Sequence, residues 1–349
     1  AAAVEDCCPH RFAPMSLGHV DGESIVCGYH GMEFDRAGCC KSIPGQKNVP
    51  SRVKIKTYPV VEKHNLIWAW TGASERADEA LIPEVHWLDA PGWKPVTGTT
   101  RYECNWILLV DNLLDLTHTT FVHQSTIGTE DVANTPITTE FGNDRVYVVR
   151  DMKNTLPSNF YKRVGGFDGM IDRWQRIWLE PPSVVVIDAG GVPAGGSRKE
   201  EANDGYTGID TRIVSMLLPV DERTVDQIWA FVRDTQPDDT ELDSDIKKSL
   251  TVTFGEDADF LAGQQANMER FPNKQMLNNT ADAGVVQTRR LIERWIEADT
   301  ATAEAADVVD ASMDDELFNA GGDKAAETYR PVSAFGLLFN SGNSHKQPV

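Results

Sequence analysis

The sequence is short of positive charge. Against 53 aspartates and glutamates it has 33 lysines and arginines, which gives the 349-residue chain a formal net charge of −20. Nucleic acids and anionic membranes carry charge of the same sign, so we expect neither as a partner. The acidic excess is explained either by a solvated surface or by a docking face for a redox partner. Charge alone leaves both interpretations open.

Long apolar runs are absent as well. No stretch approaches the roughly 18 consecutive apolar residues that a transmembrane helix needs. Residues 1–6 lack the basic segment and the apolar core of a signal peptide. We therefore expect a cytoplasmic protein.

Cysteine is scarce. The six cysteines are Cys7, Cys8, Cys27, Cys39, Cys40 and Cys104. In a long chain without a secretory signal they do not suggest a disulfide framework, and reduced thiols are free to bind metal. Cys39, Cys40 and Cys104 have no histidine at ligand spacing, so we expect these three to be structural.

The first part of the chain reads as all-β. Residues 8–72 alternate turn signals with short β-type runs at residues 24–26, 52–61 and 66–70. We predict a small all-β domain over residues 1–75.

From residue 76 to residue 349 the pattern is mixed. Residues 106–122 are apolar with helical spacing, and residues 239–270 and 281–298 read as long amphipathic helices. Strands of a larger antiparallel sheet are predicted at residues 145–150, 174–179, 183–187, 212–217 and 227–231. The expected fold class is α+β, with the β domain followed by a larger domain of antiparallel sheet and helices in a helix-grip-like arrangement.

Two short loops each offer one cysteine and one histidine. Cys8 and His10 form a C-x-H motif, and sixteen residues later Cys27 and His30 form C-x-x-H. A structural zinc site is the alternative, but zinc sites usually pair Cys with Cys and His with His. The split arrangement favours a [2Fe–2S] cluster in which the cysteines hold one iron and the histidines the other. Glycines and prolines around both loops would let backbone amides approach the sulfides.

A second group of metal-binding side chains lies in residues 111–123, an apparently helical stretch. In a regular helix His118 lies about 60° from Asp115, on the same side, whereas His123 lies roughly 140° from His118. Both imidazoles can therefore reach one metal only if the helix ends or carries a π-bulge between them. Two histidines and one carboxylate form the facial triad of non-haem iron oxygenases, which leaves positions open for O₂.

The carboxylate must come from elsewhere in the chain. The predicted helix around Phe254 and Leu261 offers Glu256, Asp257 and Asp259. Neighbouring residues face different sides of a helix, so only one of Glu256 and Asp257 can turn toward the core with the two apolar residues. Spacing leaves the three acids nearly tied, and a solvated helix face is the alternative.

Taken together, the two motifs resemble those of the Rieske oxygenase family. The first motif is C-x-H followed sixteen residues later by C-x-x-H, and the second is D-x₃-D-x₂-H-x₄-H. Within this family the chain is most similar to the vanillate O-demethylase branch and its relatives, which include dicamba O-demethylase and toluenesulfonate monooxygenase. The resemblance runs over nearly the whole chain and includes residues 111–118, 125–128, 172–175 and 282–290.

That resemblance implies roles for individual residues. His118 and His123 would bind the mononuclear iron, with Asp257 as the third ligand, and Asn112 would lie close to the iron. Asp115 would bridge His118 to a Rieske histidine of a neighbouring subunit, because members of the family are head-to-tail homotrimers.

The resemblance also implies the reaction. The chain would be the oxygenase component of a multicomponent monooxygenase that uses O₂ and NADH-derived electrons to demethylate a methoxylated aromatic acid of the vanillate type, with release of formaldehyde. It shows neither a G-x-G-x-x-G fingerprint nor a flavin-binding segment, so a separate NADH-dependent reductase with flavin and an Fe–S cluster would supply the electrons.

Two alternatives stay open beside this reaction. The same metal centres could hydroxylate the methyl group of a toluenesulfonate or the ring of another aromatic acid. An electron-transfer or sensor protein would use the Rieske domain alone, but it would need no second iron.

The start of the chain departs from the family pattern. Relatives begin several strands before the first Rieske loop, whereas this chain begins seven residues before Cys8. We expect these N-terminal strands to be missing because the sequence is incomplete, since a Rieske cluster without half of its supporting sheet should be unstable.

Overall fold

The computed structural model describes residues 1–123, 127, 132, 134–142, 144–199, 206–314 and 336–338. It divides into two compact units, residues 1–82 with the C-terminal segment from residue 333, and residues 83–332. The division therefore follows residue 82 rather than the expected residue 75. The strand β16 (Gly336–Leu338) pairs with a strand of the first unit. This strand therefore belongs to the first unit, although the expected second domain, residues 76–349, includes it.

The first unit is built from short antiparallel strands. Its three sheets have the strand orders β1-β6, β2-β3-β4-β5 and β16-β8-β7. The bounds are β1 (Ala3–Val4), β2 (His19–Asp21), β3 (Ser24–Val26), β4 (Glu33–Phe34), β5 (Cys40–Ser42), β6 (Thr57–Tyr58), β7 (Val60–Lys63) and β8 (Leu66–Ala69). The predicted strands at residues 24–26 and 66–70 are confirmed. The predicted run at residues 52–61 is divided, with Pro59 between β6 and β7.

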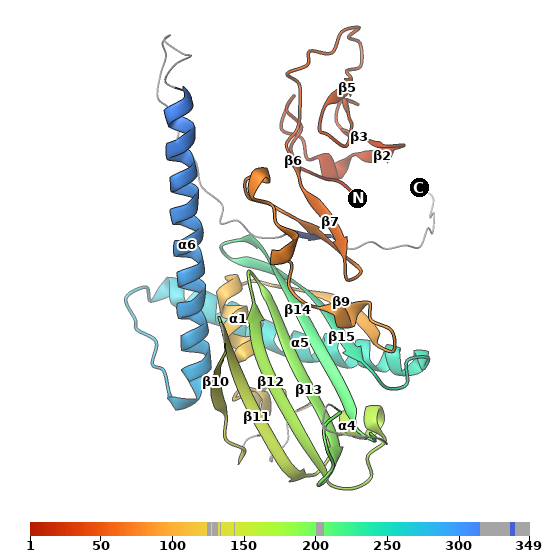
Figure 1. Ribbon diagram of the computed structural model, residues 1–349, viewed down its shortest axis with the longest axis vertical. Helices are drawn as coiled ribbons and strands as arrows, with labels where there is room; N and C mark the ends of the chain where they lie inside the picture. Colours follow the sequence, from red (N-terminus) through yellow and green to blue (C-terminus); the bar gives the residue numbers. More distant parts are fainter. Residues whose placement is uncertain are drawn as a thin grey trace. The chain divides into compact units, whose positions relative to one another are not determined.

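The second unit is organised around one seven-stranded antiparallel sheet of order β10-β11-β12-β13-β14-β15-β9 (Figure 1). The bounds are β9 (Lys94–Tyr102), β10 (Thr138–Gly142), β11 (Arg145–Thr155), β12 (Ile171–Glu180), β13 (Val184–Pro193), β14 (Ile209–Asp221) and β15 (Thr224–Arg233). All five strands predicted for this sheet are confirmed, whereas β9 and β10 were not predicted.

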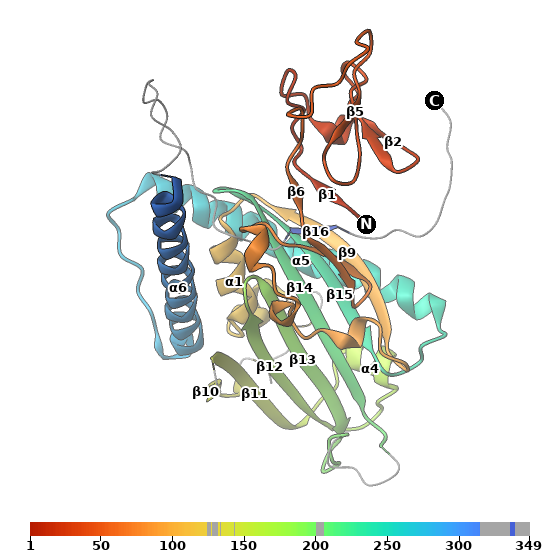
Figure 2. The ribbon, with the colours of Figure 1, turned by 45° about the horizontal axis from the view of Figure 1, so that its top comes forward.

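The helices of the second unit are α1 (Trp106–Leu114), α2 (Thr119–Val122), α4 (Asn159–Gly165), α5 (Thr240–Arg270) and α6 (Ala283–Asp314). Short 3-10 turns lie in the first unit at Met15–Leu17, Ser74–Arg76 and Glu79–Leu81, and in the second unit at His86–Leu88 and Thr280–Asp282. The two predicted long helices are confirmed as α5 and α6 (Figure 2). Asp239 caps α5, because its carboxylate accepts a hydrogen bond from the Leu242 amide at 2.8 Å. The helical stretch expected at residues 106–122 is divided into α1 and α2, since α1 ends at Leu114.

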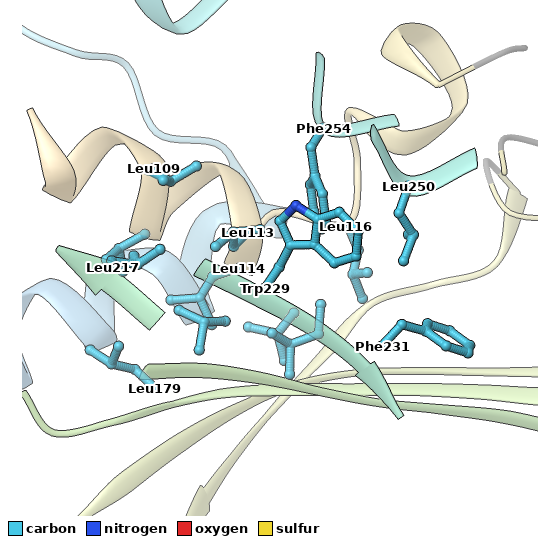
Figure 3. Close-up of a cluster of buried hydrophobic side chains, with 14 of the residues drawn as sticks. Leu109, Leu113, Leu114, Leu116, Leu179, Leu217, Trp229, Phe231, Leu250 and Phe254 are labelled. Atoms are coloured by element: carbon cyan, nitrogen blue, oxygen red, sulfur yellow. The ribbon is translucent and has the colours of Figure 1, made fainter. Parts of the chain in front are cut away.

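The core of the second unit lies between one face of the sheet and helices α1 and α5. Leu113 and Leu114 of α1 lie beside Trp229 of β15 above the sheet, and Phe231 of β15 lies near Leu250 of α5 (Figure 3). Residues with an even spacing along each strand share this face, so the sheet contributes every second side chain to the core. Each fully buried leucine contributes about 1.5–3 kcal/mol relative to an exposed one.

Strand β9 depends on a glycine. Gly98 lies opposite Trp229 in the sheet, and a Cβ at this position would come within 2.1 Å of the indole ring. The missing side chain therefore makes room for the ring, and the glycine also weakens the strand pattern of this segment in the sequence.

In the described part of the chain, no helix combines the length and apolar character needed to cross a bilayer.

Candidate functional site

The two cysteine–histidine loops of the first unit have the same design. Each makes a tight turn closed over its cysteine, with the Phe12 amide donating to the Cys8 carbonyl and the Gly31 amide to the Cys27 carbonyl, both at 2.9 Å. Cys8 and Cys27 are each 2% exposed. The structure thus brings the two predicted thiol ligands into one small core.

The two histidines of these loops lie together at the surface. The ring centroids of His10 and His30 are 4.6 Å apart, and both residues are exposed. The donor set is therefore split, with thiols inside and imidazoles outside. This split donor set fits a [2Fe–2S] cluster, in which the two thiols would hold one iron and the two imidazoles the other.

Backbone amides of both loops hydrogen-bond to the cysteine sulfurs. Burial raises the pKa of the Cys8 thiol, and the amide of His10 partly offsets this. Burial acts in the same direction on Cys27, but the amides of Tyr29 and His30 outweigh it and lower the pKa of that thiol. Gly28 allows the close approach of the loops, since a Cβ there would lie 2.3 Å from the Leu17 carbonyl oxygen.

The second constellation forms where helix α1 ends. The chain leaves α1 in an extended conformation at Asp115, and the one-turn helix α2 then begins after His118 and ends before His123. A break exists, but the prediction that it lies between the two histidines is wrong, because α2 occupies that interval and the chain instead leaves the helix at Asp115, before His118. The Nε2 atoms of the two histidines lie 3.2 Å apart.

The third side chain of this constellation comes from the middle of α5. Asp257 lies with one carboxylate oxygen 3.7 Å from His118 Nε2 and the other 3.4 Å from His123 Nε2. Donors that occupy one face of an octahedron, each about 2.1 Å from the metal, lie roughly 3 Å from one another. The three separations are close to that pattern, so the His118–His123–Asp257 cluster could hold a metal ion.

The three acids that spacing left tied have different surroundings. Asp257 is buried, at 3% exposure, whereas Asp259 is exposed. Glu256 lies beside the cluster, with its Oε2 atom 2.9 Å from His123 Nδ1. A carboxylate in this position fixes the ring so that Nε2 faces the metal site.

Two further predicted residues adjoin the cluster. Asn112 donates a 3.0 Å hydrogen bond from its side-chain amide to Asp257, which orients the carboxylate. Asp115 lies with Oδ2 3.6 Å from His118 Nδ1, and its other oxygen accepts 2.6 Å hydrogen bonds from the amide and the hydroxyl of Thr117. These contacts hold the break between α1 and α2 in place.

The electrostatics of the cluster suit a cation. Burial raises the pKa of Asp257 above its ordinary range, although His123, Asn112 and His118 oppose the shift. A buried carboxylate is costly without a charged partner, and a divalent ion among two imidazoles and this carboxylate would supply one. The donor set, two nitrogens and a carboxylate, is the one typical of non-haem iron.

A cavity of about 120 Å³ adjoins the cluster. Its polar edge comprises Asn112, Asp115, His118, His123 and Asp257. Its apolar lining includes Leu113, Leu116, Phe160, Tyr161, Ile177, Ile187, Ile213, Phe231, Leu250 and Phe254. A cavity of about 150 Å³ in another protein admits benzene, so this one is on the scale of a single aromatic ring.

Sequence reasoning assigned no role to some residues of this site. Glu256 was considered as a metal ligand but not as a partner of His123. Arg173 and Gln175 also line the cavity, and no role was assigned to either. The sequence pattern could have pointed to Arg173 and Gln175, because both are polar residues at positions of β12 where the alternation predicts apolar side chains.

Comparison with known protein families gives one match for each unit. Residues 1–59 match the Rieske [2Fe-2S] domain. Residues 102–298 match the vanillate O-demethylase oxygenase C-terminal domain, a range that takes in both histidines and Asp257.

Individual relatives agree with these matches. The chain is 37% identical over 310 residues to the vanillate O-demethylase oxygenase subunit of Pseudomonas sp. (strain HR199 / DSM 7063), covering 87% of each chain. It is 35% identical over 305 residues to the iron-sulfur subunit of the toluene-4-sulfonate monooxygenase system of Comamonas testosteroni, covering 85% of this chain and 86% of the relative.

Among solved structures, dicamba monooxygenase bound to 3,6-dichlorosalicylic acid aligns with a TM-score of 0.78 and 27% identity, covering 85% of this chain and 87% of the other. The fold, the two metal-binding constellations and the family matches agree with one another. The chain belongs to the Rieske non-haem iron oxygenases, oxidoreductases with a [2Fe–2S] cluster and a mononuclear iron, in the branch that carries the vanillate O-demethylase oxygenase C-terminal domain.

Proposed function

We propose that the chain is the oxygenase component of a monooxygenase that removes the methyl group of a methoxylated aromatic acid of the vanillate type. The observation that carries the proposal is the His118–His123–Asp257 cluster at the edge of an apolar cavity on the scale of one aromatic ring. The identity to vanillate O-demethylase oxygenase subunits over most of the chain supports the choice of reaction.

The ligand assignments belong to this proposal. The mononuclear iron would be held by His118, His123 and Asp257, and the [2Fe–2S] cluster by Cys8, His10, Cys27 and His30. Bound there, the iron supplies O₂ activation and the cluster supplies stored electrons. The overall change converts the methoxybenzoate, O₂, NADH and a proton into the hydroxybenzoate, formaldehyde, water and NAD⁺. One oxygen atom enters the methyl carbon, and the hemiacetal so formed loses formaldehyde to leave a phenol.

The residues around the cluster would orient its ligands and shape the reaction space. Asn112 fixes the carboxylate of Asp257, and Glu256 accepts the Nδ1 proton of His123, so both ligands present their metal-binding atoms to one point. The apolar walls would keep water from the reacting methyl group and hold the ring in place.

The electrons would come from a separate NADH-dependent reductase, and they would cross between subunits of a homotrimer. In this arrangement a Rieske histidine of one chain meets Asp115 of a neighbouring chain, and Asp115 lies 3.6 Å from His118. Beside the two Rieske histidines, Phe12 is 80% exposed and Tyr29 66% exposed, apolar surface that a second copy of the chain would cover. Light scattering of the purified protein tests this, because a monomer in solution would contradict it.

A second reaction is favoured by one observation, the 35% identity to the toluene-4-sulfonate monooxygenase subunit. The same site would then hydroxylate the methyl group of a methylbenzenesulfonate, or the ring of another aromatic acid. Neither reaction releases formaldehyde, so the product separates them from demethylation.

The test is NADH consumption with a generic reductase, measured over a panel of methoxybenzoates, methylbenzenesulfonates and chlorobenzoates with formaldehyde assayed in parallel. Demethylation predicts formaldehyde equal to NADH consumed for at least one methoxybenzoate. Coupled turnover without formaldehyde would keep the iron chemistry but overturn the demethylase assignment.

A further inference from the structure

The core-facing side of strand β12 carries two polar residues in an apolar row. Every second residue of this strand faces the cavity and the helices, in the order Ile171, Arg173, Gln175, Ile177 and Leu179. Three of the five are buried aliphatic residues of the core. A charged residue in such a row costs folding free energy, so its presence calls for a partner or a ligand.

Two of the three guanidinium nitrogens of Arg173 have no hydrogen-bond partner among the described residues. Arg173 is 4% exposed, and its Nε and Nη1 atoms have no hydrogen-bond acceptor in the described part of the chain. Its guanidinium lies 4.2 Å from the ring centroid of Tyr161, which fixes its plane without using its N–H groups. The Oε1 atom of Gln175 is likewise buried and unpaired.

A structural arginine of the same sheet has a different environment. Arg233 on β15 is fully buried, and its guanidinium donates to the carbonyl oxygens of Thr235 and Gln236 at 3.0 Å and pairs with Asp243 at 2.6 Å. This arginine ties the end of the strand to the start of α5. Arg173 makes no comparable contact within the described part of the chain, although it too is buried.

A second buried arginine lies near Arg173. Arg150 on β11 is also buried with unpaired Nε and Nη1 atoms, and burial lowers its pKa to about 10 while nearby Asp115 opposes the shift. Arg173 adds to the lowering by repulsion. Arg150 and Arg173 therefore lie close enough to repel each other, which adds to the cost of burying both guanidinium groups.

Only one of these two cations reaches the cavity. Among the described residues that line it, Arg173 is the one arginine or lysine, and the His118–His123–Asp257 cluster lines the same cavity. An aromatic acid bound there could place its carboxylate on the arginine while its ring fills the apolar space. Arginine is suited to this task because its planar fork donates two parallel hydrogen bonds to a carboxylate.

We propose that Arg173 binds the carboxylate of the substrate and thereby selects single-ring aromatic acids over neutral analogues. This inference rests on the proposed function, since it names the residue that recognises the acid group. Because the chain carries a net negative charge, a cationic contact in the cavity would favour the binding of an aromatic anion.

The test is direct binding, measured by calorimetry with oxidised full-length protein and without reductase, so that no turnover occurs. The ligands are vanillate and its neutral amide, which has nearly the same shape. We expect Arg173→Met to weaken vanillate binding by about 10- to 100-fold and to leave amide binding within about threefold of the unaltered protein. The matched control is Arg176→Met, because Arg176 lies on the opposite face of β12 and pairs with Glu140.

Amide binding and the melting temperature show whether the variant is folded. The ligand-free Arg173→Met protein should melt at the same or a higher temperature, because it loses an unpaired buried charge. If this variant does not fold, Arg173→Gln, which keeps a polar side chain, takes its place with the same expectation.

Two outcomes would overturn the proposal in different ways. Equal vanillate affinity in Arg173→Met and the unaltered protein would refute the role of Arg173 while leaving the demethylase function intact. A protein that binds methylbenzenesulfonates or neutral aromatics but no methoxybenzoate would refute the proposed function, and the carboxylate anchor with it.

Discussion

At the level of single residues, the His–His–Asp cluster draws its third member from a helix far away in sequence, and a neighbouring acid on that helix, Asp259, serves as a natural control. We expect Asp257→Ala to lose the mononuclear iron while the red-brown colour and the acid-labile sulfide of the Rieske cluster remain. Asp259→Ala should keep both, because Asp259 is exposed on the same helix. Metal and sulfide analysis of the two purified variants decides this, and retention of full iron by Asp257→Ala would refute the assignment.

Glu256 acts on the metal site through His123, to which its carboxylate lies within 2.9 Å. Replacing Glu256 by Leu removes the group that orients the ring, so we predict a loss of about 10-fold to 100-fold in Fe(II) affinity. A competitive chelator titration measures it. Glu241→Leu, an exposed position in the first turn of the same helix, should bind iron normally. Equal affinities in the two variants would mean that Glu256 only solvates the helix.

Burial lowers the reactivity of the Cys104 thiol. Desolvation raises the pKa of this fully buried side chain to about 11, so at pH 8 only about one thiol in a thousand is ionised. Because the thiolate is the reactive form, we expect no alkylation of Cys104 by iodoacetamide in the folded protein up to pH 9. Mass spectrometry after labelling checks this, with the urea-unfolded chain as the positive control. Rapid labelling of the folded protein would show that the site opens.

At the level of elements, the sheet was more predictable than its edges. The five central strands are long and apolar on the buried face, so their alternation is visible in the sequence. Strand β9 contains Pro95 and Gly98, and β10 is mostly exposed at the edge of the sheet, so neither shows that pattern. The sequence therefore located the buried part of the sheet but not the strands that border it.

The break between α1 and α2 was anticipated in part. The five-residue spacing of His118 and His123 required an irregular helix, but its position depends on Asp115, whose carboxylate binds the Thr117 amide. A local contact of this kind competes with the helix and has no periodic signature. The same holds for Asp257, because which of three adjacent acids faces inward depends on the exact rotation of α5.

Helices α1 and α6 are joined by a forked ion pair. Nε of Arg289 donates to both carboxylate oxygens of Asp111, at 2.9 and 3.0 Å, and Nη2 donates to one of them. Arg289→Met would leave this half-buried carboxylate without a partner, so we predict a loss of roughly 1–2 kcal/mol in the free energy of unfolding, reduced by the partial exposure of the pair. Urea denaturation measures it.

A double-mutant cycle separates the ion pair from the loss of side-chain packing. Asp111→Asn removes the charge that Arg289→Met strands, so the double variant should recover part of the lost stability. If the effects of the two substitutions simply add, the pair contributes nothing beyond its separate side chains.

At the scale of the whole molecule, the chain combines two compact units that match two different families. The first unit gathers the two cysteines and two histidines of a Rieske site, and the second gathers a His–His–Asp cluster beside an aromatic-sized cavity. Each site can be described within its own unit, and the reaction needs both. Electron storage and methyl oxidation should therefore be separable by substitutions that empty one site only.

The measurement that tests this account most directly is a single turnover without reductase. The protein is reduced chemically, freed of reductant, and mixed with vanillate and O₂, and the formaldehyde formed is quantified. We predict formaldehyde from the unaltered protein and none from Asp257→Ala, whose Rieske cluster should still accept and hold electrons. Formaldehyde from Asp257→Ala in the same yield, or none from unaltered protein with both metal sites filled, would contradict the account.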